Sequence, residues 1–166
     1  MRIEMVSLAP GRETPNHPRF PALVYRDVVP RPSAAALEAV FRDHGWPPSW
    51  RDGIFSYHHY HTRGHEALGC AGGRARVLLG GPEGQEVDVV AGDVMVLPAG
   101  TGHCLIEGSG DLLIVGAYPP GQSGDICRGP ASADMLARIR ALPVPERDPV
   151  GATDGVPACW GGDDDT

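Results

Sequence analysis

The sequence contains no lysine: all 14 residues of the lysine and arginine class are arginines. This absence excludes mechanisms that need the lysine amine, such as a Schiff base with a carbonyl substrate or a Walker-type phosphate loop. Basic surface is also scarce, because the net charge is -7 and the pI is about 5.4. Proteins that bind nucleic acid through its phosphates usually carry a basic face, so we expect no nucleic-acid partner.

Cysteine is also sparse, and its four occurrences form no CxxC pair, which excludes a zinc ribbon and a dense disulfide framework. The N-terminal residues lack the apolar core of a signal peptide. No apolar run approaches the length needed to span a bilayer. We therefore expect a protein of the reducing cytoplasm with no membrane partner.

Glycine and proline, by contrast, are abundant, with 23 and 17 occurrences that separate short β-like runs. This punctuation is typical of many short strands joined by turns. Seven such runs fall between residues 53 and 118, at 53–61, 66–71, 74–80, 86–91, 93–99, 103–108 and 111–118. The sequence has no internal repeat, so it predicts one closed antiparallel barrel.

The segments on either side of this span predict the flanking elements of a single domain. In residues 1–52, we expect a Pro-punctuated surface segment (1–21), a strand (22–29) and a helix (33–45) that begins after Ser33 and stops at Gly45.

Residues 1–52 should pack on the barrel, whose core is 53–118, or on a partner chain. Residues 119–166 predict a second helix over 132–142, followed by an extended tail from Pro143.

The stretch GIFSYHHYHTRGHEALGCAGG, residues 53–73, holds four of the seven histidines. If its first part is a strand, His59 and His61 share one face, about 6.6 Å apart, and can converge on one ion. A turn at 62–64 would then bring Glu66 alongside on the next strand, completing a set of two histidines and a carboxylate. Later in the chain, the turn LPAGTGH delivers His103 as a possible fourth ligand.

A helical interpretation of the same stretch is the alternative. It would place His61 and His65, four residues apart, on one face, as in zinc metalloproteases. Thr62, Arg63 and Gly64 are typical of a turn, however, and the preceding residues are aromatic and β-like, which favours the strand.

Two spaced motifs in this region resemble those of the cupin superfamily. The first motif is matched by Gly53, His59, His61, Glu66 and Gly73. The second is matched by Gly92, Pro98, Gly100 and His103, although its asparagine position holds Glu107. The segments GWPPSWRDGI, YHHYH and AYPPGQ further resemble the YjlB-like branch of small bacterial cupins.

The resemblance implies a single all-β cupin barrel, also called a double-stranded β-helix or jelly roll, with flanking N- and C-terminal helices. It also implies one divalent metal ion per chain, held by His59, His61, Glu66 and His103. Such barrels usually form homodimers through their strands and N-terminal segment. The expected ion is Fe, Mn, Ni, Cu or Zn, because this ligand set does not choose among them.

The remaining residues of interest have more ordinary interpretations. By strand alternation, His58 and His65 point away from the ion and suit a surface or interface, although His65 could also support Glu66 from outside. Cys70 shares the face of Glu66 and should act as a small packing residue. Four further residues either line the cavity or, as is commoner, only fill the core: Phe55, Tyr57, Leu105 and Tyr118.

Two classes of function remain open from the sequence. One is a metal-dependent enzyme acting on an unknown small molecule, either as a dioxygenase or as an isomerase or lyase, with no catalytic residue assigned. The other is a non-catalytic metal or small-ligand binding module of the sensor type. Sensor cupins are often fused to a DNA-binding helical domain, and the sequence shows no pattern that predicts one, which favours the enzyme.

Overall fold

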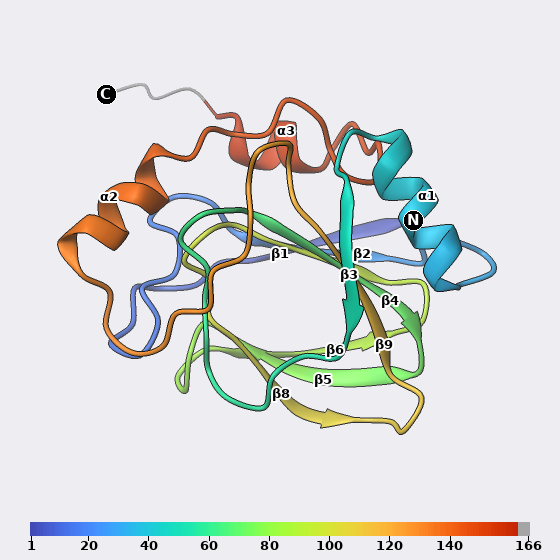
Figure 1. Cartoon of the computed structure of the whole chain (residues 1–166), viewed down its shortest axis with the longest axis horizontal. Helices are drawn as coiled ribbons and strands as arrows, with labels where there is room; N and C mark the ends of the chain where they lie inside the picture. Colours follow the sequence, from blue (N-terminus) through green and yellow to red (C-terminus); the bar gives the residue numbers. More distant parts are fainter. Residues whose placement is uncertain (163–166) are drawn as a thin grey trace.

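The computed structural model describes residues 1–162, and these fold into two antiparallel sheets with three helices around them (Figure 1). The larger sheet has six strands in the order β1-β2-β7-β4-β9-β3. Its strands are β1 (Arg2–Val6), β2 (Ala22–Arg26), β3 (Pro48–Asp52), β4 (Glu66–Gly72), β7 (Val94–Leu97) and β9 (Leu113–Ala117). The predicted all-β class, a single barrel with flanking N- and C-terminal helices, is confirmed.

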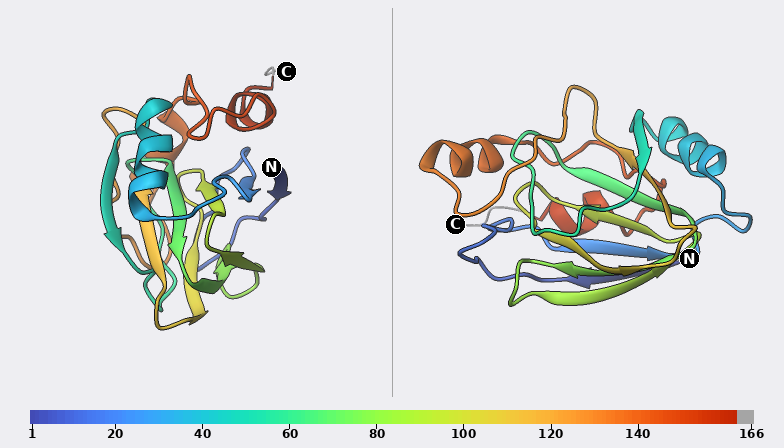
Figure 2. Two further views of the ribbon diagram at one scale, coloured as in Figure 1. Left: turned by 90° about the vertical axis from the view of Figure 1, so that its right-hand side faces the viewer. Right: turned by 60° about the horizontal axis from the view of Figure 1, so that its bottom comes forward.

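The smaller sheet has three strands in the order β6-β5-β8. Its strands are β5 (Arg74–Leu79), β6 (Gln85–Val90) and β8 (His103–Gly108). Within residues 1–162, hydrogen bonding thus divides the wall of the barrel into two sheets. Figure 2 shows the smaller sheet facing the larger one, away from the helices.

Two hydrophobic cores follow from alternation along the larger sheet. Leu68, Cys70 and Met95 point between the two sheets and pack with Val77 and Val89 of the smaller sheet. This placement confirms Cys70 as a buried packing residue, 1% exposed. Because the alternate residues of β4 are also buried, β4 is covered on both faces and reads as an almost unbroken apolar run.

Helix α1 (Ala34–Asp43) covers the outer face of the larger sheet. It begins as predicted, with the Ser33 hydroxyl accepting a hydrogen bond from the backbone N–H of Ala36. Its Phe41 ring lies so close to β4 that a Cβ at Gly69 would be 3.0 Å from the ring. Glycine at 69 therefore allows the helix to approach the strand.

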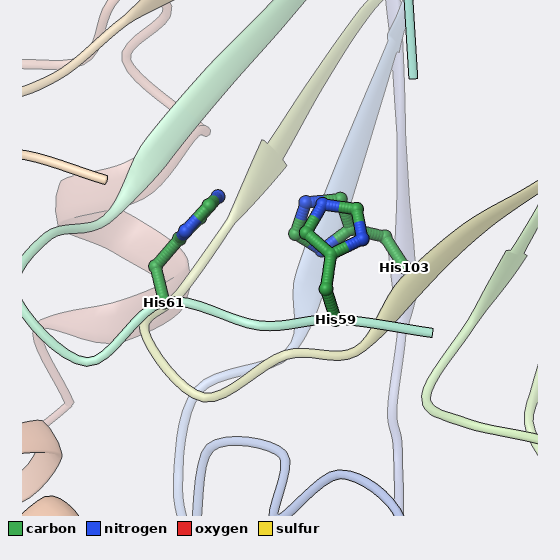
Figure 3. A group of neighbouring side chains, drawn as sticks. All are labelled: His59, His61 and His103. Atoms are coloured by element: carbon green, nitrogen blue, oxygen red, sulfur yellow. The ribbon is translucent and has the colours of Figure 1, made fainter. Parts of the chain in front are cut away.

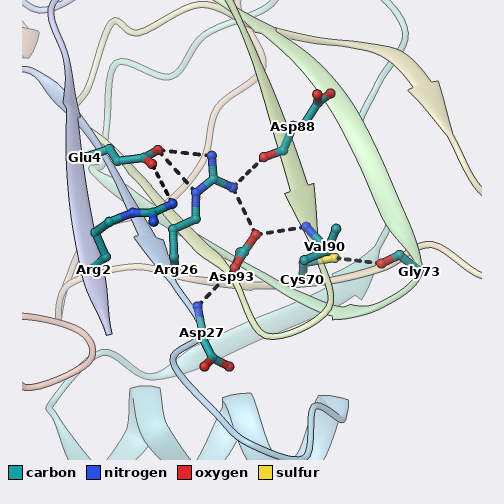
Figure 4. Close-up of polar contacts among 9 residues, drawn as sticks. All are labelled: Arg2, Glu4, Arg26, Asp27, Cys70, Gly73, Asp88, Val90 and Asp93. Atoms are coloured by element: carbon teal, nitrogen blue, oxygen red, sulfur yellow. Dashed lines mark hydrogen bonds and ion pairs between the residues drawn. The ribbon is translucent and has the colours of Figure 1, made fainter.

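Arg26 connects the two sheets at one end through ion pairs and a hydrogen bond (Figure 4). Its guanidinium pairs with Glu4 of β1 at 3.1 Å and with Asp93, just before β7, at 3.0 Å. The same group donates to the backbone carbonyl of Asp88 on β6, in the smaller sheet. Because Asp93 is almost fully buried, this contact is better shielded from solvent than an ordinary surface ion pair.

Three sequence expectations about the elements need correction. Residues 53–61 form no regular strand: they run extended beside β8, bridging it at His59–His103, with a bend at Ser56 and Tyr57 that interrupts the ladder. The strand predicted over 22–29 ends at Arg26. Strands β1 and β3 were not expected, so the larger sheet extends beyond the 53–118 range.

The C-terminal segment also departs from the expected extended tail. Helix α2 (Ala133–Ala141) lies where predicted, but a third helix, α3 (Val156–Trp160), follows Pro143. Trp160 is 1% exposed and donates from its indole N–H to the Pro21 carbonyl. Ala152, Val156 and Trp160 of this segment thus belong to the core, and residues 163–166 lie outside the described range. Within residues 1–162, no helix is long and apolar enough to cross a membrane.

Candidate metal centre

Three histidines meet at one end of the space between the sheets (Figure 3). His59 and His61 come from the extended segment before β4, and His103 begins β8. One ring nitrogen from each of the three lies within 4.8 Å of the others, and all three side chains are buried. His59 and His61 point to the same side, as their spacing of two residues predicts. An extended backbone alternates the direction of its side chains even where it forms no regular ladder of hydrogen bonds.

Backbone carbonyls fix the orientation of all three rings. The Nδ1 atom of His59 is 3.0 Å from the Tyr57 carbonyl, and that of His103 is 3.0 Å from the Thr101 carbonyl. The Nδ1 atom of His61 contacts the Asp125 carbonyl. A carbonyl can only accept, so each Nδ1 carries a proton, and in the neutral ring this leaves the lone pair on Nε2. Hydrogen bonds of this kind orient metal-binding imidazoles in proteins.

The Glu66 carboxylate lies against this triad and is 2% exposed. Its Oε1 atom is 3.1 Å from His61 Nε2 and 3.6 Å from His103 Nε2. A carboxylate oxygen facing the lone pair of a neutral imidazole is unfavourable unless a cation lies between them, either a second proton on the ring or a metal ion. The donor set therefore fits a divalent metal.

Without an ion, the charges of this cluster favour one extra proton on His61. Burial opposes a charge on His61, but the Glu66 carboxylate outweighs it and raises the pKa of His61 to about 8. Burial and the neighbouring His59 lower the pKa of His103 to about 3. Burial acts against the charge of Glu66 too, yet His61 and His103 keep its pKa below the usual value. One carboxylate thus shares one proton with His61.

Tyr118 and Trp50 hold the other oxygen of Glu66. The Tyr118 hydroxyl donates to Oε2 at 2.6 Å, and the Trp50 indole N–H donates to that hydroxyl at 3.0 Å. Burial and the adjacent Glu66 carboxylate raise the pKa of Tyr118 above its usual range, which keeps the hydroxyl protonated. The Trp50 ring lies over Gly116 of β9, where any side chain would collide with it.

A cavity of about 330 Å³ opens from this centre toward solvent. Of the residues predicted to line it, Phe55 and Tyr118 do so, whereas Tyr57 and Leu105 are not among its lining residues. Two residues of the site were not predicted from the sequence: Trp50, which lines the cavity, and Asp125, whose carbonyl orients His61. Trp50 lies in the segment GWPPSWRDGI, which resembles the YjlB-like cupins. That resemblance is the one feature of the sequence that could have indicated a role for Trp50.

His65 lies outside the centre, but the expectation of a surface or interface position is wrong. Its ring is fully buried, with Phe20 and Trp160 each within 6.2 Å between ring centroids. Its Nδ1 accepts from the backbone N–H of Ala99, and its Nε2 donates to the Pro143 carbonyl. Both nitrogens are therefore used by hydrogen bonds to the backbone, and His65 does not belong to the three-histidine group.

This burial predicts a loss of stability in acid. Burial lowers the pKa of His65 to about 4. Below pH 6.5, His65 therefore binds a proton in the unfolded chain but stays neutral in the folded chain. Stability should therefore fall as the pH drops from 6.5 to about 4, by about 3 kcal/mol for this residue. Urea unfolding with a chelator at several pH values measures the loss, and a His65→Gln variant should show a smaller pH dependence. Equal pH dependence in the two proteins would contradict the assignment.

The fold and the site together define a small β-barrel protein with a buried three-histidine centre able to hold a metal ion. The chain is 36% identical to the uncharacterized protein YjlB of Bacillus subtilis (strain 168) over 138 residues, which cover 82% of each chain. It therefore belongs to the YjlB family. No protein-family model matches the chain.

A solved structure is also similar: Streptomyces albus HEPD, with its substrate 2-hydroxyethylphosphonate and Fe(II) bound. The likeness covers 76% of this chain but 22% of HEPD, at 17% sequence identity and a TM-score of 0.30. At that level the chemistry of HEPD does not transfer to this chain.

Proposed function

We propose that this chain is a metal-binding cupin that acts, as the expected homodimer, on a small molecule entering the 330 Å³ cavity. The Nε2 atoms of His59, His61 and His103 hold one divalent ion, together with Oε1 of Glu66. The observation that carries the proposal is the set of three Nδ1–carbonyl contacts, which turn three lone pairs toward one point. Three neutral imidazoles and a carboxylate suit Fe, Mn, Ni, Cu or Zn.

When bound, the ion supplies Lewis-acid or redox chemistry at positions that the protein leaves open. The chain's own residues do the rest. Tyr118 and Trp50 fix the Glu66 carboxylate through its Oε2 atom, which keeps Oε1 directed at the histidines. The side chains at the inner end of the cavity are buried, which strengthens each of these electrostatic contacts.

Metal analysis of protein purified without an affinity tag tests the proposal. We expect about one transition-metal ion per chain, or stoichiometric uptake of Co²⁺ by protein first stripped with a chelator. Oxygen uptake by the iron- and copper-loaded forms then separates the dioxygenase from the isomerase or lyase. Protein that neither carries nor takes up a divalent ion would overturn the proposal, whereas metal without any turnover would favour the non-catalytic binding module.

A further inference from the structure

The cavity in front of the three histidines changes character along its depth. Its inner end is polar and buried, with His61, Glu66 and His103 between 2% and 6% exposed. Its outer part is apolar and more open: Ile54 is half-buried, Phe55 is 47% exposed and Ile126 is 50% exposed. A molecule that fits this gradient places a polar group at the histidines and an apolar body against the mouth.

The histidines aside, the charged side chains that line the cavity are all of one sign. Among the residues of the described chain that line it, the acidic ones are Glu66 inside and Asp52 at the mouth, and none is an arginine. Because the chain has no lysine, an anionic group on a ligand could be paired only by arginine or by the metal. Arg128, two residues after Ile126, instead lies over the Tyr57 ring, with Cζ 4.1 Å from the ring centroid.

We propose that this site takes a small ligand with a metal-binding polar head and an uncharged aromatic or aliphatic body. The inference rests on the proposed metal centre and adds the class of its ligand. A carboxylate or phosphate on the body would lose water beside Ile54, Phe55 and Ile126 without gaining a cationic partner, and Asp52 would repel it. The apolar mouth would contact an uncharged body instead.

Two hydroxamates with the same chelating head test this inference on Co²⁺-loaded protein: benzohydroxamate and its 4-carboxy derivative. We expect benzohydroxamate to bind roughly ten-fold more tightly, as measured by calorimetry, because the carboxylate meets no cation at a half-exposed mouth. Equal or tighter binding of the carboxy derivative would overturn the inference. If Arg128 supplied such binding by swinging inward, R128Q would remove it.

Matched variants show whether the body of the probe lies at the mouth. Ile126→Ala should weaken benzohydroxamate roughly five-fold, by loss of apolar contact. Ile106→Ala serves as the control, because Ile106 is 48% exposed but lies on β8 away from the cavity lining. Equal effects of the two substitutions would also overturn the inference. Failure to take up Co²⁺ would instead show that the metal centre itself is wrong, and both proposals would fall.

Discussion

Replacing His61 or His103 by alanine is expected to weaken metal binding by more than roughly 100-fold. Loss of an outer hydrogen-bond partner already costs 10- to 100-fold in metal sites, and loss of a ligand removes a direct bond as well. The measurement is a Co²⁺ titration of each metal-stripped variant. Bound metal should also raise the melting temperature of the wild-type protein but not of these variants, since a ligand that binds only the folded state stabilises it by mass action.

His58→Ala is the control for this result. His58 adjoins His59 in sequence, is partly exposed and does not belong to the three-histidine group. The variant should therefore keep full stoichiometry and a metal-induced stabilisation like that of the wild type. Equal loss of metal in His58→Ala and His61→Ala would mean that the extended segment is placed in the wrong register, since a shift of one residue exchanges the faces.

The candidate centre was predictable from sequence because it depends on local spacing. His59 and His61 face the same way in any extended backbone, whether or not it pairs as a strand, so they converge although residues 53–61 form no regular strand. Glu66 begins a strand whose inward face also carries Leu68 and Cys70. His103 follows a turn that the Pro-Gly pattern marks clearly. Metal ligation by these residues stays a prediction.

What the sequence did not predict depends on distant segments. His65 is buried because Phe20, near the N-terminus, and Trp160, in α3, both pack against it. Nothing within a few residues of His65 indicates this cover. The bend at Ser56 and Tyr57 has a similar cause, because the chain must leave β3 in the larger sheet and reach β8 in the smaller one. Local propensity favours a strand there, but this crossing overrides it.

The packing of the C-terminal segment is the largest feature of the fold that the composition of the sequence did not predict. A stretch rich in proline, glycine and aspartate is typical of an exposed tail, yet here one of its aspartates organises the packing. Asp148 is 4% exposed, and its Oδ1 accepts from the backbone N–H groups of Val150 and Ala152. Its Oδ2 accepts from the Val156 N–H and from the Tyr25 hydroxyl on β2. Two turns, helix α3 and the larger sheet therefore meet at one carboxylate.

Asp148→Ala should accordingly destabilise the protein by about 3 kcal/mol or more, because it leaves buried donors, including the Tyr25 hydroxyl, without an acceptor. Asp148→Asn should cost less, since its carbonyl oxygen still accepts from Val150 and Ala152 while its amide faces the other two donors. Urea unfolding followed by tryptophan fluorescence measures both, because Trp160 lies in α3. Asp154→Ala, an exposed neighbour, is the control and should change stability by less than about 0.5 kcal/mol. A similarly small change in the stability of Asp148→Ala would contradict the role of this carboxylate. The C-terminal segment would then be the loosely attached tail that its composition suggests.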